Sequence, residues 1–283
     1  MTTTASDPTT DVAYSVRRVG TTFGAEISGI DLAVGVDGVT AAALQRDLLT
    51  HKVLAFPGQH LTAAQHVAAV EIFGRPFDHP TAVRDAGHPL AYPYEVSGRE
   101  TASAWHVGGL WRTPPFSLES LTFQSVPDVG GHTQWADLQA AYDDLSEPVR
   151  TLLESVSAVY DANPVNYAQT REKTAVDPSA THPVVLAHPE TGRKGLFLSS
   201  SARALTGVSE EEGRVLLPFL LAHASAPRYT IRFAWEPGDF AVWDNLAAWH
   251  AVVDDGAVGV RRYRKVLADR GPAAEGSGGD ATG

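Results

Sequence analysis

The chain has 283 residues, and its 33 acidic and 22 basic side chains give a formal net charge of −11. This charge offers no electrostatic attraction to nucleic acid or to anionic membranes, and no apolar run reaches the roughly 18 residues that span a bilayer. Because the chain has no cysteine, thiolate metal sites, disulfides and thiol nucleophiles are excluded, so a metal site must use His, Asp or Glu. The N-terminus does not resemble a signal peptide, and we expect a cytoplasmic protein.

The two ends of the chain differ in composition from its middle. Residues 1–11 are polar and rich in Thr, and residues 271–283 are small and flexible, so we expect both ends to be disordered. No segment rich in Gly, Pro or Ser divides the remainder. The sequence therefore predicts a single domain over residues 12–270.

Hydrophobic periodicity predicts a mixed succession of strands and helices. In the first part we expect a strand over 13–18, a helix over 40–51 capped by Thr40, a strand over 52–56 and a helix over 62–73 capped by Thr62. Next come strands over 118–126 and 131–135 and helices over 137–145 and 148–155. The last part has strands over 183–188, 195–198, 229–234, 239–243 and 261–267, with a helix over 208–224 capped by Ser209. Dispersed strands that outnumber helices favour an α+β fold, a β-sandwich or jelly roll with helices packed outside.

Two of the eleven histidines lie in informative contexts. His106 and His250 each follow a Trp and lie in or after a strand-like apolar stretch. Two imidazoles from distant strands of a jelly roll are a common way to hold non-haem iron. Partly buried histidines packed beside tryptophans would give the same pattern, and spacing alone leaves both interpretations open.

Several segments, taken in their order along the chain, favour metal binding over simple packing of the two histidines. They are Gly24–Leu32, Lys52–Phe56, Trp105-His106, Thr113–Pro115, Gly130–Trp135, Glu236–Asn245 and Arg261–Lys265. Together they resemble the taurine dioxygenase-like family of iron(II)- and 2-oxoglutarate-dependent oxygenases, from about Val16 to Leu267. The resemblance implies a double-stranded β-helix, which is a cupin-like jelly roll. It also implies Fe(II), 2-oxoglutarate, O₂ and a small-molecule substrate, with no indication of the oligomeric state.

The resemblance also assigns roles to individual residues. His106 is similar to the first iron ligand of the family's His-x-Asp…His triad, and His250 to the distal one. Thr133 lies where the family places a hydroxyl on 2-oxoglutarate. Arg261 matches the arginine that holds the distal carboxylate of that cosubstrate, a task for which a planar guanidinium is well suited.

Two further residues are candidates for substrate contact. Lys265 lies near a position where relatives with anionic substrates carry a basic group, but a solvated lysine at a strand end is an equal alternative. His79 lies where family members often place substrate-contacting residues, and its alternative is a surface loop. We interpret Asp244 and Asn245 as structural, and Asp137 as a helix N-cap.

The chain departs from the family pattern at Gly108, where the triad requires Asp. The favoured hypothesis is that chloride or another halide takes the vacant position. The resemblance supports it by analogy, because the related non-haem iron halogenases carry Gly or Ala at this position. A second hypothesis is a hydroxylase in which Gly108 is an engineered replacement of Asp. A third is a site that is inactive, such as a non-catalytic binding module, or that uses a carboxylate from elsewhere in the chain.

Overall fold

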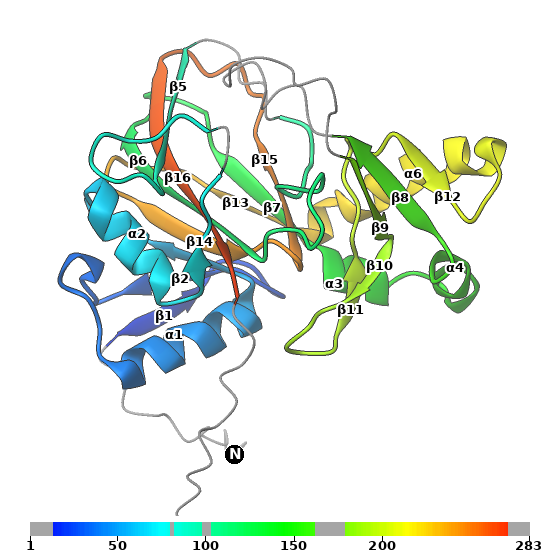
Figure 1. The fold of residues 1–283 in the computed structure, drawn as a ribbon, viewed down its shortest axis with the longest axis horizontal. Helices are drawn as coiled ribbons and strands as arrows, with labels where there is room; N and C mark the ends of the chain where they lie inside the picture. The colour runs from blue at the N-terminus through cyan, green and yellow to red at the C-terminus, as the bar shows by residue number, and fades with distance from the viewer. Residues whose placement is uncertain (1–13, 80–81, 98–102, 162–178, 271–283) are drawn as a thin grey trace, which may run out of the picture.

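A computed structural model describes residues 14–79, 82–97, 103–161 and 179–270 (Figure 1). Both predicted disordered ends lie outside these ranges. Within them, no helix combines the length and the apolar character needed to cross a membrane.

The largest element is an eight-stranded sheet. Its path runs β1 (Ser15–Arg18), β2 (Ala25–Ser28), β3 (Val53–Phe56), β14 (Phe240–Asp244), β6 (Leu118–Ser125), β16 (Val260–Asp269) and β4 (Arg75–Pro76), and β5 (Tyr92–Ser97) also pairs with β16. All pairs are antiparallel except β2 with β3. The central strands β3 and β14 are buried along their whole length, because both faces of the sheet are covered.

A second sheet of three strands lies against one face of the first. It consists of β13 (Thr230–Phe233), β7 (Thr133–Asp137) and β15 (Ala248–Val252), with β7 in the centre (Figure 1). A buried aromatic cluster joins the two sheets: the Trp135 ring of β7 lies 5.7 Å from that of Trp243 on β14, and Trp235 stacks on Phe123 of β6. Side chains of both sheets therefore converge on one interior.

Two helices, α1 (Gly38–His51) and α2 (Ala63–Glu71), cover the opposite face of the large sheet. Thr62 caps α2 in a capping box with Gln65, which confirms the predicted helix start. The helix predicted over 40–51 is present as α1, but it begins two residues earlier and its predicted cap is wrong. Asp37 is its N-cap and accepts a hydrogen bond from the Thr40 backbone N–H, so Thr40 lies inside the first turn.

The remaining elements form a third buried cluster beside the small sheet. They are the helices α3 (Leu138–Asp143), α4 (Glu147–Leu153) and α6 (Glu210–Ala224), the sheet of β8 (Ser157–Asp161), β9 (Ser179–Pro183) and β12 (Ala204–Thr206), and the pair β10 (Val185–Ala187) and β11 (Lys194–Leu196). The 3-10 helices are η1 (Leu32–Val34) and η2 (Pro227–Tyr229). Ser209 caps α6 and Asp137 caps α3, as predicted.

A buried ion pair joins the residue between α1 and β3 to the N-cap residue of α3. Lys52 Nζ lies 2.6 Å from Asp137 Oδ2, and both side chains are almost completely buried. Replacing Lys52 with Met is expected to lower the free energy of unfolding by about 3–5 kcal/mol, because Asp137 would remain buried without a compensating charge. Urea denaturation measures the change. Lys194→Met is the control: its pair with Glu154 is exposed, so its loss should leave the free energy of unfolding nearly unchanged, and equal losses in the two variants would contradict the prediction.

Candidate active site

The structure brings His106 and His250 together, although they lie far apart in the sequence. Their backbones form an isolated antiparallel bridge, in which each N–H donates to the other residue's carbonyl at 3.0 Å. The two ring centroids are 4.1 Å apart. Because His250 belongs to β15 in the small sheet, this bridge attaches the His106 segment to the edge of that sheet.

The imidazoles are neutral, and one of them has a defined tautomer. His106 Nδ1 lies 2.8 Å from the carbonyl oxygen of Ala104, which can only accept, so Nδ1 carries the proton and Nε2 keeps its lone pair. Burial lowers the pKa of His106 to about 4. Burial, followed by the proximity of His106, lowers the pKa of His250 well below its usual value. Neutral imidazole is the form that binds a metal ion.

The segment after His106 is fixed by Asn245. The Asn245 side chain donates to the carbonyl oxygens of Gly108 and Phe116 at 2.9 and 2.8 Å, and its Oδ1 accepts from the Gly108 N–H at 3.1 Å. Asn245 is fully buried directly after β14. The sequence predicts a structural role for Asn245, and its hydrogen bonds hold the backbone of the position that departs from the family's triad.

The space beside Gly108 is filled by Glu119. A Cβ placed on Gly108 would lie 1.5 Å from Glu119 Oε1 and 2.4 Å from Glu119 Cδ. The expectation that the missing side chain leaves an open position is therefore wrong, because a longer carboxylate side chain from β6 reaches into that volume. A halide at this point would meet both the atoms and the negative charge of Glu119.

Glu119 is 2% exposed, and two basic side chains lie near its carboxylate. Its Oε2 lies 3.3 Å from His250 Nε2 and 3.7 Å from Lys265 Nζ. Burial raises the pKa of Glu119, and the positive charge of Lys265 opposes that rise. Within the described ranges, no three His, Cys, Asp or Glu side chains already surround one point as a complete metal-binding group.

Strand alternation explains why these groups meet. On β6, Leu118 packs toward the helices α1 and α2, whereas Leu121 and Phe123 belong to the aromatic cluster between the sheets. Since side chains two residues apart share a face, Glu119 points to that same interior. Arg261 and Lys265 on the neighbouring strand β16 share this face with Tyr263, which belongs to the edge of the cluster.

Thr133 and Arg261 form a second polar pair nearby. Thr133 lies on β7 opposite Val252, two residues beyond His250 on β15. Its Oγ1 accepts hydrogen bonds from Trp235 Nε1 at 2.9 Å and from Arg261 Nη2 at 3.1 Å. A hydroxyl has two acceptor lone pairs and one proton, so both lone pairs are used and its O–H is left to donate.

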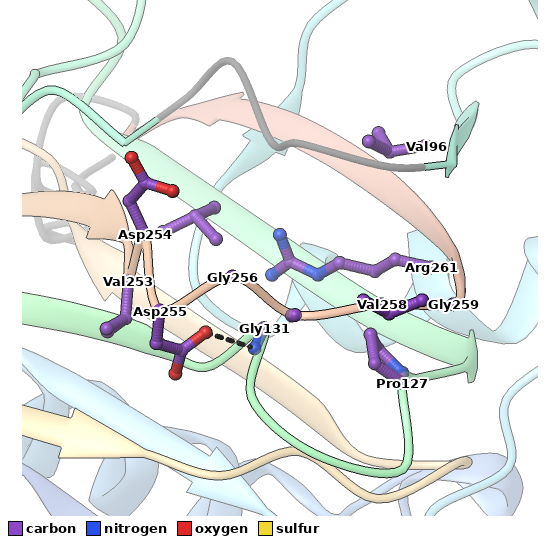
Figure 2. A pocket seen from close by; sticks show the side chains of 12 residues that line it. Val96, Pro127, Gly131, Val253, Asp254, Asp255, Gly256, Val258, Gly259 and Arg261 are labelled. Atoms are coloured by element: carbon purple, nitrogen blue, oxygen red, sulfur yellow. Dashed lines mark hydrogen bonds between the residues drawn. The ribbon is translucent and has the colours of Figure 1, made fainter.

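The Arg261 guanidinium lies at a cavity of about 460 Å³ (Figure 2). Arg261 itself is 4% exposed and packs over the rings of Phe123 and Tyr263 at 4.9 and 5.1 Å. The loop that follows β15 forms much of the wall, and Asp255 in that loop accepts a hydrogen bond from the Gly131 N–H. The cavity lining includes Val252 but neither of the two histidines.

The two candidate substrate-contacting residues are Lys265 and His79. Lys265 is partly exposed and has its ammonium 5.9 Å from the Tyr94 ring centroid. His79 packs edge-on against Trp111 and Tyr92. Burial lowers the pKa of His79, and the charge of Lys265 lowers it further, which indicates that the two side chains share one environment.

The sequence interpretation missed Glu119, and a signal for it existed. Glu119 is the only charged residue in the stretch Leu118–Ser125, which lies within a segment that the sequence predicts to be a strand. Asp and Glu are almost never fully buried unless they have a partner, so a carboxylate in a central strand indicates a functional role. Trp235, which orients Thr133, was also missed and carried no comparable signal.

Comparison with known proteins identifies the family. Residues 15–265 match the model of the taurine catabolism dioxygenase TauD, TfdA family. The chain belongs to this family. It is 32% identical to an alkylsulfatase of Acinetobacter baylyi, covering 90% of this chain and 84% of that protein. It is also 32% identical to an alpha-ketoglutarate-dependent sulfate ester dioxygenase of Pseudomonas putida, covering 89% and 88%.

A solved structure supports the same family assignment. A crystal structure of a taurine dioxygenase from Burkholderia xenovorans superposes with a TM-score of 0.79 at 32% identity, covering 91% of this chain and 90% of that one. This TauD, TfdA family member is thus an enzyme of the Fe(II)- and 2-oxoglutarate-dependent dioxygenase class. The relatives named here give no support for halogenation or for bound chloride.

Proposed function

We propose that this TauD, TfdA family enzyme is a hydroxylase of a small organic anion that uses Fe(II) and 2-oxoglutarate. In this proposal the large sheet and the sheet β13-β7-β15 are the two halves of a double-stranded β-helix, within one domain over residues 12–270. The observation that carries the proposal is the pairing of His106 with His250, two residues along β15 from Val252, which lies opposite the Thr133 that Arg261 contacts.

The residues fit an iron site. His106 and His250 are neutral and fixed at the backbone, and His106 presents the Nε2 lone pair. His250 is buried, and its Nδ1 has no hydrogen-bond partner among the described residues. Nitrogen and oxygen ligands of this kind suit non-haem Fe(II), which when bound would supply the activation of O₂.

Arg261 and Thr133 would hold 2-oxoglutarate by its distal carboxylate. The guanidinium offers a planar fork of N–H donors, and the Thr133 O–H is oriented to donate beside it. Because both groups are buried among Phe123, Tyr263 and Trp235, water competes poorly for the carboxylate. The chain would thereby fix the cosubstrate at its distal carboxylate.

Lys265 and His79 support an anionic substrate. Lys265 supplies a positive charge next to the histidines, and His79 with Trp111 adds an aromatic wall. Two of the relatives are named for sulfate esters, which carry such an anion. Hydroxylation of the carbon that bears the sulfate ester would give an adduct that breaks its C–O bond to yield an aldehyde and hydrogensulfate.

Hydroxylation is preferred to halogenation because of Glu119. The halide would have to enter the volume that the Glu119 carboxylate already occupies beside Gly108. The negative charge of that carboxylate disfavours a second anion at contact distance, particularly in a buried site.

The experiment uses the full chain with Fe(II), 2-oxoglutarate, O₂ and a panel of alkyl sulfates and aryloxy carboxylates. We expect succinate to form in step with an oxygenated product or released sulfate, and product mass to stay the same when chloride or bromide is added. Halogen in the product would contradict the hydroxylase assignment. Absence of succinate with every substrate would instead indicate a binding module.

A further inference from the structure

We infer that Glu119 is the third protein ligand of the metal, replacing the carboxylate that Gly108 cannot supply. This inference rests on the proposed function, since it presumes that His106 and His250 hold the metal. It differs from the family's pattern in the origin of the carboxylate. The ligand comes from β6 of the large sheet and not from the position two residues after the first histidine.

The first argument is the place of the carboxylate. Glu119 Oε1 lies 1.5 Å from the point where residue 108 would carry its Cβ, so Glu119 occupies the space in which an aspartate side chain at this position would begin. The backbone of Gly108 is also held in place beside Glu119. Asn245 fixes the Gly108 backbone at both its N–H and its carbonyl, and a side chain at position 108 would collide with Glu119.

The second argument is the distance to His250. Two ligand atoms that bind side by side to one metal ion, each at about 2.1 Å, lie roughly 3 Å from each other. Glu119 Oε2 and His250 Nε2 are 3.3 Å apart. The three side chains do not yet surround a single point. Metal binding therefore requires a rotation of the Glu119 side chain, which has three rotatable bonds.

The third argument is the unsatisfied carboxylate. Glu119 Oε2 is fully buried and has no hydrogen-bond partner among the described residues, and Lys265 Nζ at 3.7 Å is beyond hydrogen-bond distance. A buried carboxylate oxygen that lacks a hydrogen bond is unfavourable unless a cation compensates its charge. Lys265 supplies part of that compensation from the exposed side, and a metal ion at the two imidazoles would supply the rest.

Binding of Mn(II) alone tests the inference, with free Mn(II) counted by electron paramagnetic resonance. Glu119→Gln keeps the shape and removes the charge, and Glu119→Asp keeps the charge and shortens the reach. If Glu119 is a ligand, both variants should lose at least about tenfold in affinity. Glu95→Gln is the control, because Glu95 is exposed on β5 and pairs with Arg262; it should bind as the unmodified chain does.

A second pair of variants relocates the carboxylate. Gly108→Asp combined with Glu119→Ala should bind Mn(II) at least about tenfold more tightly than Glu119→Ala alone, because the new carboxylate would take over the vacated space. Thermal unfolding of each variant without metal checks that the fold is kept.

The outcomes separate this inference from the proposed function. Affinities of Glu119→Gln and Glu119→Asp within twofold of the unmodified chain would overturn the ligand role of Glu119 while leaving the two histidines in place. A loss of Mn(II) affinity in Glu119→Gln with unchanged Mn(II) affinity in Glu119→Asp would also overturn the ligand role. A through-space effect of the negative charge would explain that result without direct coordination. If the unmodified chain binds no Mn(II), the proposed function itself fails.

Discussion

Alanine at position 106 or 250 is expected to weaken Mn(II) binding by at least about 100-fold. Each substitution removes an imidazole that is neutral and already oriented, and loss of the outer partners of metal ligands alone costs about 10- to 100-fold. The bridge that joins the two residues uses backbone atoms, so it can survive the substitutions. The loss should therefore reflect the missing ligand and not a displaced strand.

The measurement is the same Mn(II) titration, combined with thermal unfolding to verify the fold. His223→Ala is the matched control. His223 lies on α6, where its Nε2 lies 2.7 Å from the carbonyl oxygen of Ala141, and its removal should leave Mn(II) affinity unchanged. If either His106→Ala or His250→Ala bound Mn(II) as tightly as this control, the pair would be a packing feature and no metal site.

Local sequence patterns are sufficient to predict those helices whose capping residues and hydrophobic periodicity lie within the helix segment itself. Thr62 and Ser209 each precede a capping partner three residues later and an amphipathic stretch, and both helices begin there. The start of α1 was misplaced because Asp37 and Thr40 are both good caps, and only the backbone geometry shows that Asp37 accepts the hydrogen bond. The short strands β5 and β15 were missed because each depends on long-range pairing.

The candidate site was predictable only where a family motif covers it. His106, His250, Thr133 and Arg261 were chosen through the resemblance, and the structure places them as two adjacent pairs. Glu119 could not be placed in this way. Its position beside Gly108 depends on the register of β6, in which Glu119 lies opposite Trp243 of β14 and Leu267 of β16. A shift of one residue would turn the carboxylate toward α2.

Removal of the Arg261 side chain is expected to raise the dissociation constant for 2-oxoglutarate by roughly 30-fold or more. Truncating one partner of a buried, hydrogen-bonded charge pair costs about 2–5 kcal/mol, and each 1.4 kcal/mol is about tenfold in affinity. Arg261 also donates to Thr133 Oγ1, so the alanine variant loosens the hydroxyl that accompanies it. Arg261→Lys should recover only part of the loss, because an ammonium keeps the charge but not the planar fork.

Binding of 2-oxoglutarate to the Mn(II)-loaded chain, followed by calorimetry, measures this change without turnover. Arg262→Ala is the control on the same strand: Arg262 is exposed and pairs with Glu95 at the surface, so its loss should leave 2-oxoglutarate affinity unchanged. Metal affinity should stay the same in all three variants, because Arg261 contacts Thr133, Phe123 and Tyr263 and belongs to the cavity that excludes the histidines. Unchanged 2-oxoglutarate affinity in Arg261→Ala would mean that the cosubstrate carboxylate is held elsewhere, and the cavity in Figure 2 would then have to receive another ligand.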